Sequence, residues 1–133
     1  MPDFSASQSA SAVPARTTFQ YIESLTDLTA LIEASALSPV AVFLHDPWCP
    51  ISAGALEEME LLGGTLPTID VSEHRALNRE VEQRTSVRHE SPQVIVLHNT
   101  VVVGHWSHGR ISADKVRAAL VPRSITYPSR APK

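Results

Sequence analysis

The chain has 133 residues, 43% of them hydrophobic, and a formal net charge of −3. This length suits one small domain, and no apolar run approaches the roughly 18 to 20 residues of a membrane span. Lys and Arg are scattered, and the first residues lack the apolar core of a secretory signal. We therefore expect a cytoplasmic protein that binds neither nucleic acid nor a membrane.

The two ends of the sequence differ in composition from its middle. Residues 1–16 are rich in Ser, Ala and Pro without periodicity, and residues 122–133 are rich in Pro and basic residues. Such segments bury too little apolar surface to offset the entropy lost on ordering. We predict a disordered N-terminal extension at 1–16, a folded domain at 17–121 and a flexible C-terminal tail at 122–133.

Helical and extended patterns alternate within this domain. Apolar or alternating runs predict strands at 17–21, 40–44, 66–71, 94–97 and 101–103. Capping residues, or a proline at the first helical position, predict helix starts at Thr26, Pro50, Ser72 and Ser112. His98-Asn99 separates the last two strands, which we expect to form a hairpin. The order β-α-β-α-β-α-β-β-α predicts an α/β, thioredoxin-like fold, with a central mixed β-sheet flanked by helices.

The helix that begins near Pro50 has apolar residues at helical spacing. They predict a buried face formed by Ile51, Ala55, Met59 and Leu62.

Cys49 is the only cysteine of the chain. It follows the buried strand at 40–44 and precedes Pro50, which predicts that it lies at a helix N-cap. There the helix macrodipole and free N–H groups favour the thiolate, which can both attack a disulfide and leave one. One cysteine cannot form an internal disulfide, so exchange requires a sulfur from another molecule. The alternative is an inert, buried cysteine.

Ser52 stands where a C-x-x-C oxidoreductase has its second cysteine. A hydroxyl cannot close a disulfide, but it can donate a hydrogen bond to a thiolate, so we expect Ser52 to stabilise Cys49. The alternative is a serine that satisfies only backbone groups at the helix start.

The segment Ser91-Pro92-Gln93 immediately precedes a predicted strand. A proline at this place in a thioredoxin-like fold is typically cis and adjacent to the cysteine, and a trans turn proline is the alternative. In the cis form, Ser91 exposes its backbone to an incoming thiol or peptide. His89, in this loop, and His45, four residues before Cys49, are the expected neighbours of the sulfur.

The sequence argues against two other kinds of site. His105, His108 and Cys49 allow a metal site, but we expect none because there is no second cysteine and no helical H-x-x-x-H pair. A hydrolase is not expected either, since neither a G-x-S-x-G elbow nor a papain-like cysteine segment is present.

Two segments together resemble the YtxJ-like monothiol bacilliredoxins: HDPWCPISAGALEE, from His45 to Glu58, and VRHESPQ, from Val87 to Gln93. The match covers most of residues 38–120 and also includes Asp70-Val71, Arg75, Asn78 and Ser107-His108. Asp46-Pro47-Trp48 departs from the small polar residues of the loop in that family.

The resemblance implies a thioredoxin-like fold and exchange with bacillithiol, a low-molecular-weight thiol of certain bacteria. Carried over by position, Cys49 is the attacking thiol, Ser52 the non-resolving partner and Pro92 the cis-proline. The implied reaction is de-bacillithiolation, the removal of bacillithiol from protein mixed disulfides through a Cys49-bacillithiol intermediate. Bacillithiol is then a co-substrate, bacillithiolated proteins are the partners, and no tightly bound cofactor is expected.

The residues expected to bind substrate are Trp48, Pro50, His89, Ser91 and Pro92. Arg88 and His89 can attract the carboxylates of bacillithiol, with a solvated surface role as the alternative for Arg88.

Two alternative functions, from other classes of protein, stay open. One is an iron-sulfur or small-thiol binding scaffold, in which Cys49 and a small thiol hold a cluster across a dimer. The other is a non-catalytic interaction module.

Overall fold

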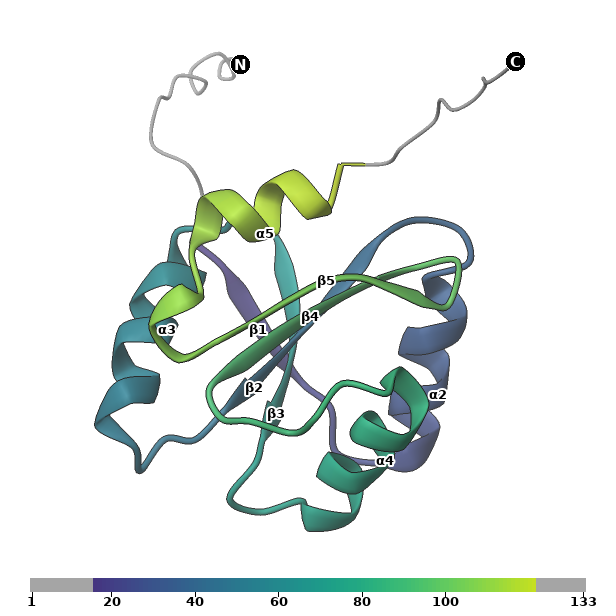
Figure 1. The fold of residues 1–133 in the computed structure, drawn as a ribbon, viewed down its shortest axis with the longest axis horizontal. Helices are drawn as coiled ribbons and strands as arrows, with labels where there is room; N and C mark the ends of the chain where they lie inside the picture. The colour runs from purple at the N-terminus through teal and green to yellow at the C-terminus, as the bar shows by residue number, and fades with distance from the viewer. Residues whose placement is uncertain (1–15, 122–133) are drawn as a thin grey trace, which may run out of the picture.

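A five-stranded mixed sheet lies at the centre of the fold (Figure 1). The computed structural model describes residues 16–121, and the predicted flexible ends, apart from Arg16, lie outside the described residues. The strands are β1 (Thr18–Tyr21), β2 (Val40–His45), β3 (Thr65–Asp70), β4 (Gln93–His98) and β5 (Val101–Ser107). Their order in the sheet is β1-β3-β2-β4-β5, with β1, β3 and β2 parallel and β4 and β5 antiparallel to their neighbours.

Helices cover both faces of this sheet (Figure 1). They are α2 (Leu25–Ala34), α3 (Pro50–Glu60), α4 (Arg75–Thr85) and α5 (Ala113–Ala119), and a short 3-10 helix, η2 (His108–Arg110), precedes α5. Within residues 16–121, no helix combines the length and apolar character that crossing a membrane requires. The predicted element order and the thioredoxin-like fold class are confirmed.

The central strand β2 contributes to two hydrophobic clusters. Val42 and Leu44 point to the face covered by α2 and α4, whereas Ala41 and Phe43 point to the face covered by α3 and α5. Because successive side chains of a strand alternate between faces, a strand covered on both sides needs apolar residues at every position. This explains the unbroken apolar run of the sequence.

Two predicted helix starts are wrong. The N-cap of helix α2 is Ser24, two residues before the predicted Thr26, and its side chain accepts the N–H of Asp27. Helix α4 begins after His74 rather than after Ser72, since Ser72 bonds back to the carboxylate of Asp70 in a turn. The predicted starts at Pro50 and Ser112 are confirmed.

The predicted inner face of α3 is partly wrong. Ile51 is 58% exposed, whereas Ser52 is fully buried beside Ala55 and Met59 on the face that meets the sheet. The hydrophobic pattern favoured Ile51 as the inner residue of the first turn. The structure instead places a polar side chain inward there, where it has hydrogen-bonding partners.

The hairpin of β4 and β5 is confirmed, with its turn one residue later than predicted, at Asn99-Thr100, both of which have positive φ. Strand β5 also continues beyond the predicted 103 to Ser107. Gly104 lies under the indole of Trp106, where an added Cβ would stand only 2.7 Å from a ring carbon. A glycine at this position therefore lets the ring lie along the strand.

Candidate functional site

Cys49 lies at the start of α3, directly after the central strand. It is the N-cap residue, in an extended conformation, and Pro50 occupies the first helical position. The thiol is partly buried and unbonded to another cysteine. Its side chain makes no capping hydrogen bond with α3.

The loop between β2 and α3 is held by hydrogen bonds at both ends. The carbonyl of Asp46 accepts the N–H of Cys49 at 3.1 Å, and its carboxylate accepts the N–H of Trp48 at 3.0 Å. The Ser52 hydroxyl accepts the N–H of Asp46 at 3.1 Å. These contacts fix the position of Cys49 relative to the strand and the helix.

The Ser52 side chain has a second partner that the sequence analysis missed. Its Oγ lies 2.8 Å from Nδ1 of His45, the last residue of β2, and both side chains are buried. Strand alternation was the available signal, since His45 follows Ala41 and Phe43 on the face of β2 that meets α3. The expected donation from Ser52 to the sulfur of Cys49 is not among the contacts of this hydroxyl and stays a prediction.

His45 is a buried and electrically neutral group at neutral pH. Burial lowers the pKa of its imidazole below 6.5, and the nearby charges of Asp70 and Asp46 oppose this shift only in part. Its ring also stacks on Phe43, with centroids 5.2 Å apart. The imidazole is thus fixed on one side by the core and on the other by Ser52.

Two exposed apolar side chains flank Cys49. Trp48 is 83% exposed and Ile51 is 58% exposed, although both are large hydrophobic residues. Exposed apolar groups grouped beside a reactive atom are typical of surfaces that contact another molecule.

The loop before β4 lies at the same edge of the sheet as Cys49. Leu44 pairs with Gln93, so the end of β2 is beside the start of β4, and the Ser91-Pro92 peptide bond is cis as expected. The buried amide of Gln93 holds the loop from within: it donates to the carbonyl of Arg88 at 2.9 Å and accepts the N–H of Glu90 at 3.3 Å.

Three other predicted site residues, Arg88, His89 and Ser91, lie in the loop before β4. Arg88 is exposed, and Nδ1 of His89 and Oγ of Ser91 are buried atoms without a hydrogen-bonding partner among the described residues. Within residues 16–121 no group of three or more His, Cys, Asp or Glu side chains could hold a metal ion. The structure thus brings His45, Ser52 and Cys49 together in one segment and sets Pro92 at the neighbouring strand.

Comparison with known proteins identifies a family of thiol-redox proteins and solved structures with the same fold. The family model of the monothiol bacilliredoxin BrxC matches residues 20–116. A protein with a thioredoxin fold, described as a candidate oxidoreductase, is 27% identical with a TM-score of 0.68, over 77% of this chain and 93% of its own.

Two thioredoxins share the fold at lower identity. The thioredoxin of Malassezia sympodialis is 16% identical with a TM-score of 0.60, over 82% of this chain and 92% of its own. A thioredoxin mutant from Halobacterium salinarum NRC-1 is 16% identical with a TM-score of 0.59, over 88% of this chain and 98% of its own. The family match covers most of the described residues, including the Cys49 loop and the cis-proline loop. The chain belongs to the monothiol bacilliredoxin BrxC family.

Proposed function

We propose that the protein removes bacillithiol from protein mixed disulfides through a Cys49-bacillithiol intermediate, in the cytoplasm. The observation that carries this proposal is the sole cysteine of the chain at the N-cap of α3, with the buried Ser52 where a second cysteine would stand. A thiol-redox role fits the family and the fold. The single cysteine makes the protein a carrier of one thiol, because it cannot release that thiol by closing its own disulfide.

The reaction proceeds in two exchanges. The Cys49 thiolate attacks the bacillithiol sulfur of the mixed disulfide, a new S–S bond forms, and the client cysteine leaves as a thiolate that takes a proton from water. A second low-molecular-weight thiol, as its thiolate, then attacks the bacillithiol sulfur and releases Cys49. The client disulfide is reduced, and the two small thiols leave as an oxidised disulfide.

The residues around Cys49 suit both exchanges. Cys49 is the N-cap of α3, a position at which a helix macrodipole favours a thiolate, and a favoured thiolate is a good leaving group in the second step. Trp48, Pro50 and Ile51 offer apolar contact to the client polypeptide, and Ser91, Pro92 and His89 belong to the loop that leads into β4 at the same edge of the sheet. His45 acts through Ser52 as a positioning residue that fixes the loop carrying Cys49.

The experiment mixes the purified protein with a bacillithiolated client protein and follows both by intact-mass spectrometry. We expect the bacillithiol mass to leave the client and appear on the protein, and then to disappear when free bacillithiol is added. The matched control is Cys49→Ser, which should leave the client unchanged. An adduct that never reaches Cys49, or that leaves the client equally fast with Cys49→Ser, would show that the proposal is wrong.

A further inference from the structure

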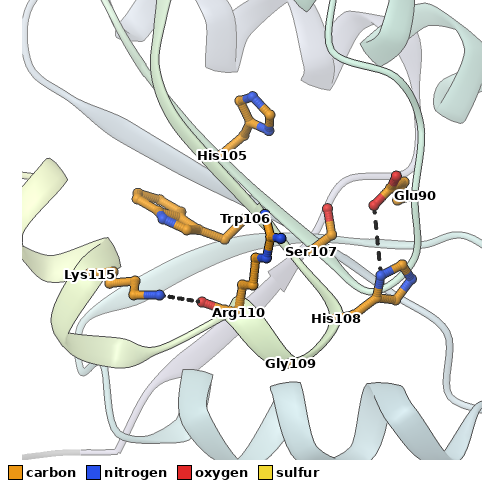
Figure 2. A pocket seen from close by; sticks show the side chains of 8 residues that line it. All are labelled: Glu90, His105, Trp106, Ser107, His108, Gly109, Arg110 and Lys115. Carbon is orange, nitrogen blue, oxygen red and sulfur yellow. Dashed lines mark hydrogen bonds and ion pairs between the residues drawn. The ribbon is translucent and has the colours of Figure 1, made fainter.

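A cavity of about 800 Å³ opens where β5 ends (Figure 2). Its walls come from the end of β5, the turn η2, the start of α5 and Glu90 of the loop before β4. In Figure 2 the side chain of Arg110 lies between Lys115 and Trp106 on one side and the Glu90–His108 pair on the other. The cavity is therefore lined by several ionisable groups.

Two permanent cations in this cavity lack a carboxylate partner. Among residues 16–121, neither Arg110 nor Lys115 forms an ion pair, and Lys115 donates only to the backbone carbonyl of Arg110, at 3.3 Å. The single carboxylate, Glu90, lies 3.7 Å from Nδ1 of His108. A hydrogen bond from Ser107 lowers the pKa of the Glu90 carboxyl, with the charges of His108 and other nearby groups adding to the effect. The cavity thus has an excess of positive charge.

Three neighbouring strands bring this cavity and Cys49 to one edge of the sheet. Leu44 of β2 pairs with Gln93 of β4, and Gln93 pairs with Ser107 of β5. The N–H of His108 also donates to the carbonyl of Pro92 at 3.0 Å, and η2 packs against α3. Since adjacent strands lie about 4.8 Å apart, the ends of β2 and β5, which lead to Cys49 and to the cavity, are about 10 Å apart.

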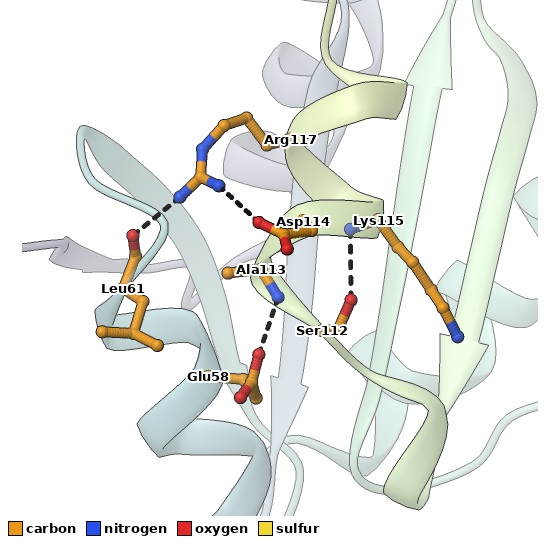
Figure 3. Close-up of polar contacts among 7 residues, drawn as sticks. All are labelled: Glu58, Leu61, Ser112, Ala113, Asp114, Lys115 and Arg117. Carbon is orange, nitrogen blue, oxygen red and sulfur yellow. Dashed lines mark hydrogen bonds and ion pairs between the residues drawn. The ribbon is translucent and has the colours of Figure 1, made fainter.

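The wall that carries Lys115 is held firmly against α3 (Figure 3). Glu58 of α3 accepts the N–H of Ala113 at 2.9 Å, and Arg117 donates to the carbonyl of Leu61 at 2.8 Å. Cys49 is the N-cap of α3, so the sulfur and the cationic wall are attached to opposite ends of the same helix. A ligand that spans them meets a preformed surface.

We propose that this cavity binds the carboxylates of the small thiol that Cys49 carries, with Arg110 and Lys115 as the cationic groups. The proposal rests on the proposed function and deepens it, because it identifies where an anionic thiol is recognised. The planar guanidinium of Arg110 suits a carboxylate, which it can bind with two parallel hydrogen bonds. Glu90 opposes binding by its charge and so limits the affinity for anionic thiols.

The test compares two mixed disulfides of the same short peptide, one with bacillithiol and one with β-mercaptoethanol, which has no carboxylate. We expect Arg110→Gln to raise KM for the bacillithiol disulfide about tenfold, which corresponds to about 1.4 kcal/mol, with kcat little changed. The β-mercaptoethanol disulfide should react as with the wild-type protein. Glu90→Gln should lower KM for the bacillithiol disulfide, and Arg79→Gln, on α4, is the matched control of the same charge change.

The outcomes separate this inference from the proposed function. If both disulfides react but Arg110→Gln affects them equally, or if Arg88→Gln raises KM and Arg110→Gln does not, the cavity is not the carboxylate site. If the wild-type protein takes the thiol from neither disulfide, the proposed function itself is wrong.

Discussion

The Nδ1 atom of His45 lies 2.8 Å from the Oγ atom of Ser52, and this contact joins the end of β2 to the first turn of α3. The same hydroxyl accepts the N–H of Asp46. One buried serine therefore joins the two ends of the loop that carries Cys49.

Removing this hydroxyl should destabilise the protein. In Ser52→Ala, the buried Nδ1 of His45 and the N–H of Asp46 lose a partner, and an unsatisfied buried polar group costs about 1 to 3 kcal/mol. Urea denaturation should show a decrease in the free energy of unfolding of that size. Ser38→Ala, at an exposed position, is the matched control. A Ser52→Ala protein as stable as this control would contradict the assigned role of the contact.

The stability should fall with decreasing pH because of His45. Burial lowers the pKa of His45 in the folded protein, so below about pH 6.5 the unfolded chain binds more protons than the folded one. The stabilisation from neutral His45 is present above about pH 6.5 and is lost as the pH falls through the folded-state pKa. Thermal melts between about pH 5.5 and about pH 7.5 should show this slope, and His45→Gln should reduce it.

The control for this pH dependence is His98→Gln, at the partly exposed end of β4, which should keep the wild-type slope. The Glu90 carboxyl does not interfere, because the hydrogen bond from Ser107 lowers its pKa below 4.5 and its protonation falls in a more acidic range. An unchanged slope in His45→Gln would mean that other groups cause the acid sensitivity.

A second cysteine at position 52 should convert the carrier into a self-resolving protein. Ser52→Cys places a thiol three residues after Cys49 in the first helical turn, from where it can attack the Cys49 mixed disulfide and release the small thiol. Intact-mass spectrometry should show an adduct lifetime at least about tenfold shorter than in the wild-type protein. Ala53→Cys, whose side chain is exposed, is the matched control, and an equal loss of adduct in both variants would contradict the geometry.

The exposed ring beside Cys49 should matter for large substrates. Trp48→Ala should raise KM several-fold for a folded bacillithiolated protein, because a large apolar contact at the interface is lost. It should leave the reaction with a bacillithiolated dipeptide nearly unchanged. Leu37→Ala, at a residue that is 91% exposed and outside the site, is the control. Equal effects on the protein and the dipeptide would assign Trp48 to the small thiol instead.

Two glycines should respond in opposite ways to alanine. Gly104→Ala should cost about 1 to 3 kcal/mol, since its Cβ would stand 2.7 Å from the Trp106 ring and force it to move. The tryptophan fluorescence of the protein should change as the Trp106 ring moves. Gly54→Ala, in α3, meets no atom within 4 Å and should stabilise by about 0.5 to 1 kcal/mol. A stable Gly104→Ala protein with unchanged fluorescence would show that the ring adapts without cost.

Local patterns in the sequence are enough to predict the fold and the place of Cys49 in it. An unbroken apolar run marks the strand β2, and Pro50 marks the start of α3, so both were predictable without a structure. The start of α2 was not, because Ser24 and Thr26 are both good caps and only the backbone geometry decides between them.

The interior of the site depends on long-range placement. Hydrophobicity favours Ile51 over Ser52 for the inner face of α3, yet the partner that makes a buried serine acceptable belongs to a different element. The cavity at η2 likewise combines Glu90 with residues after β5, which only the sheet brings together. To predict such pairings one must know the register of the sheet and the rotation of a helix about its axis. Neither follows from a local pattern in the sequence.

The stacking of His45 on Phe43 has a consequence for how this protein can change. Phe43 is a fully buried member of the cluster that packs α3 on the sheet, and its ring is also the surface on which the imidazole rests. A substitution made there to improve packing would also shift the imidazole, and with it the loop of the thiol. The stability of the fold and the reactivity of the Cys49 thiol are therefore coupled at Phe43. A variant designed to improve either property should be assayed for both.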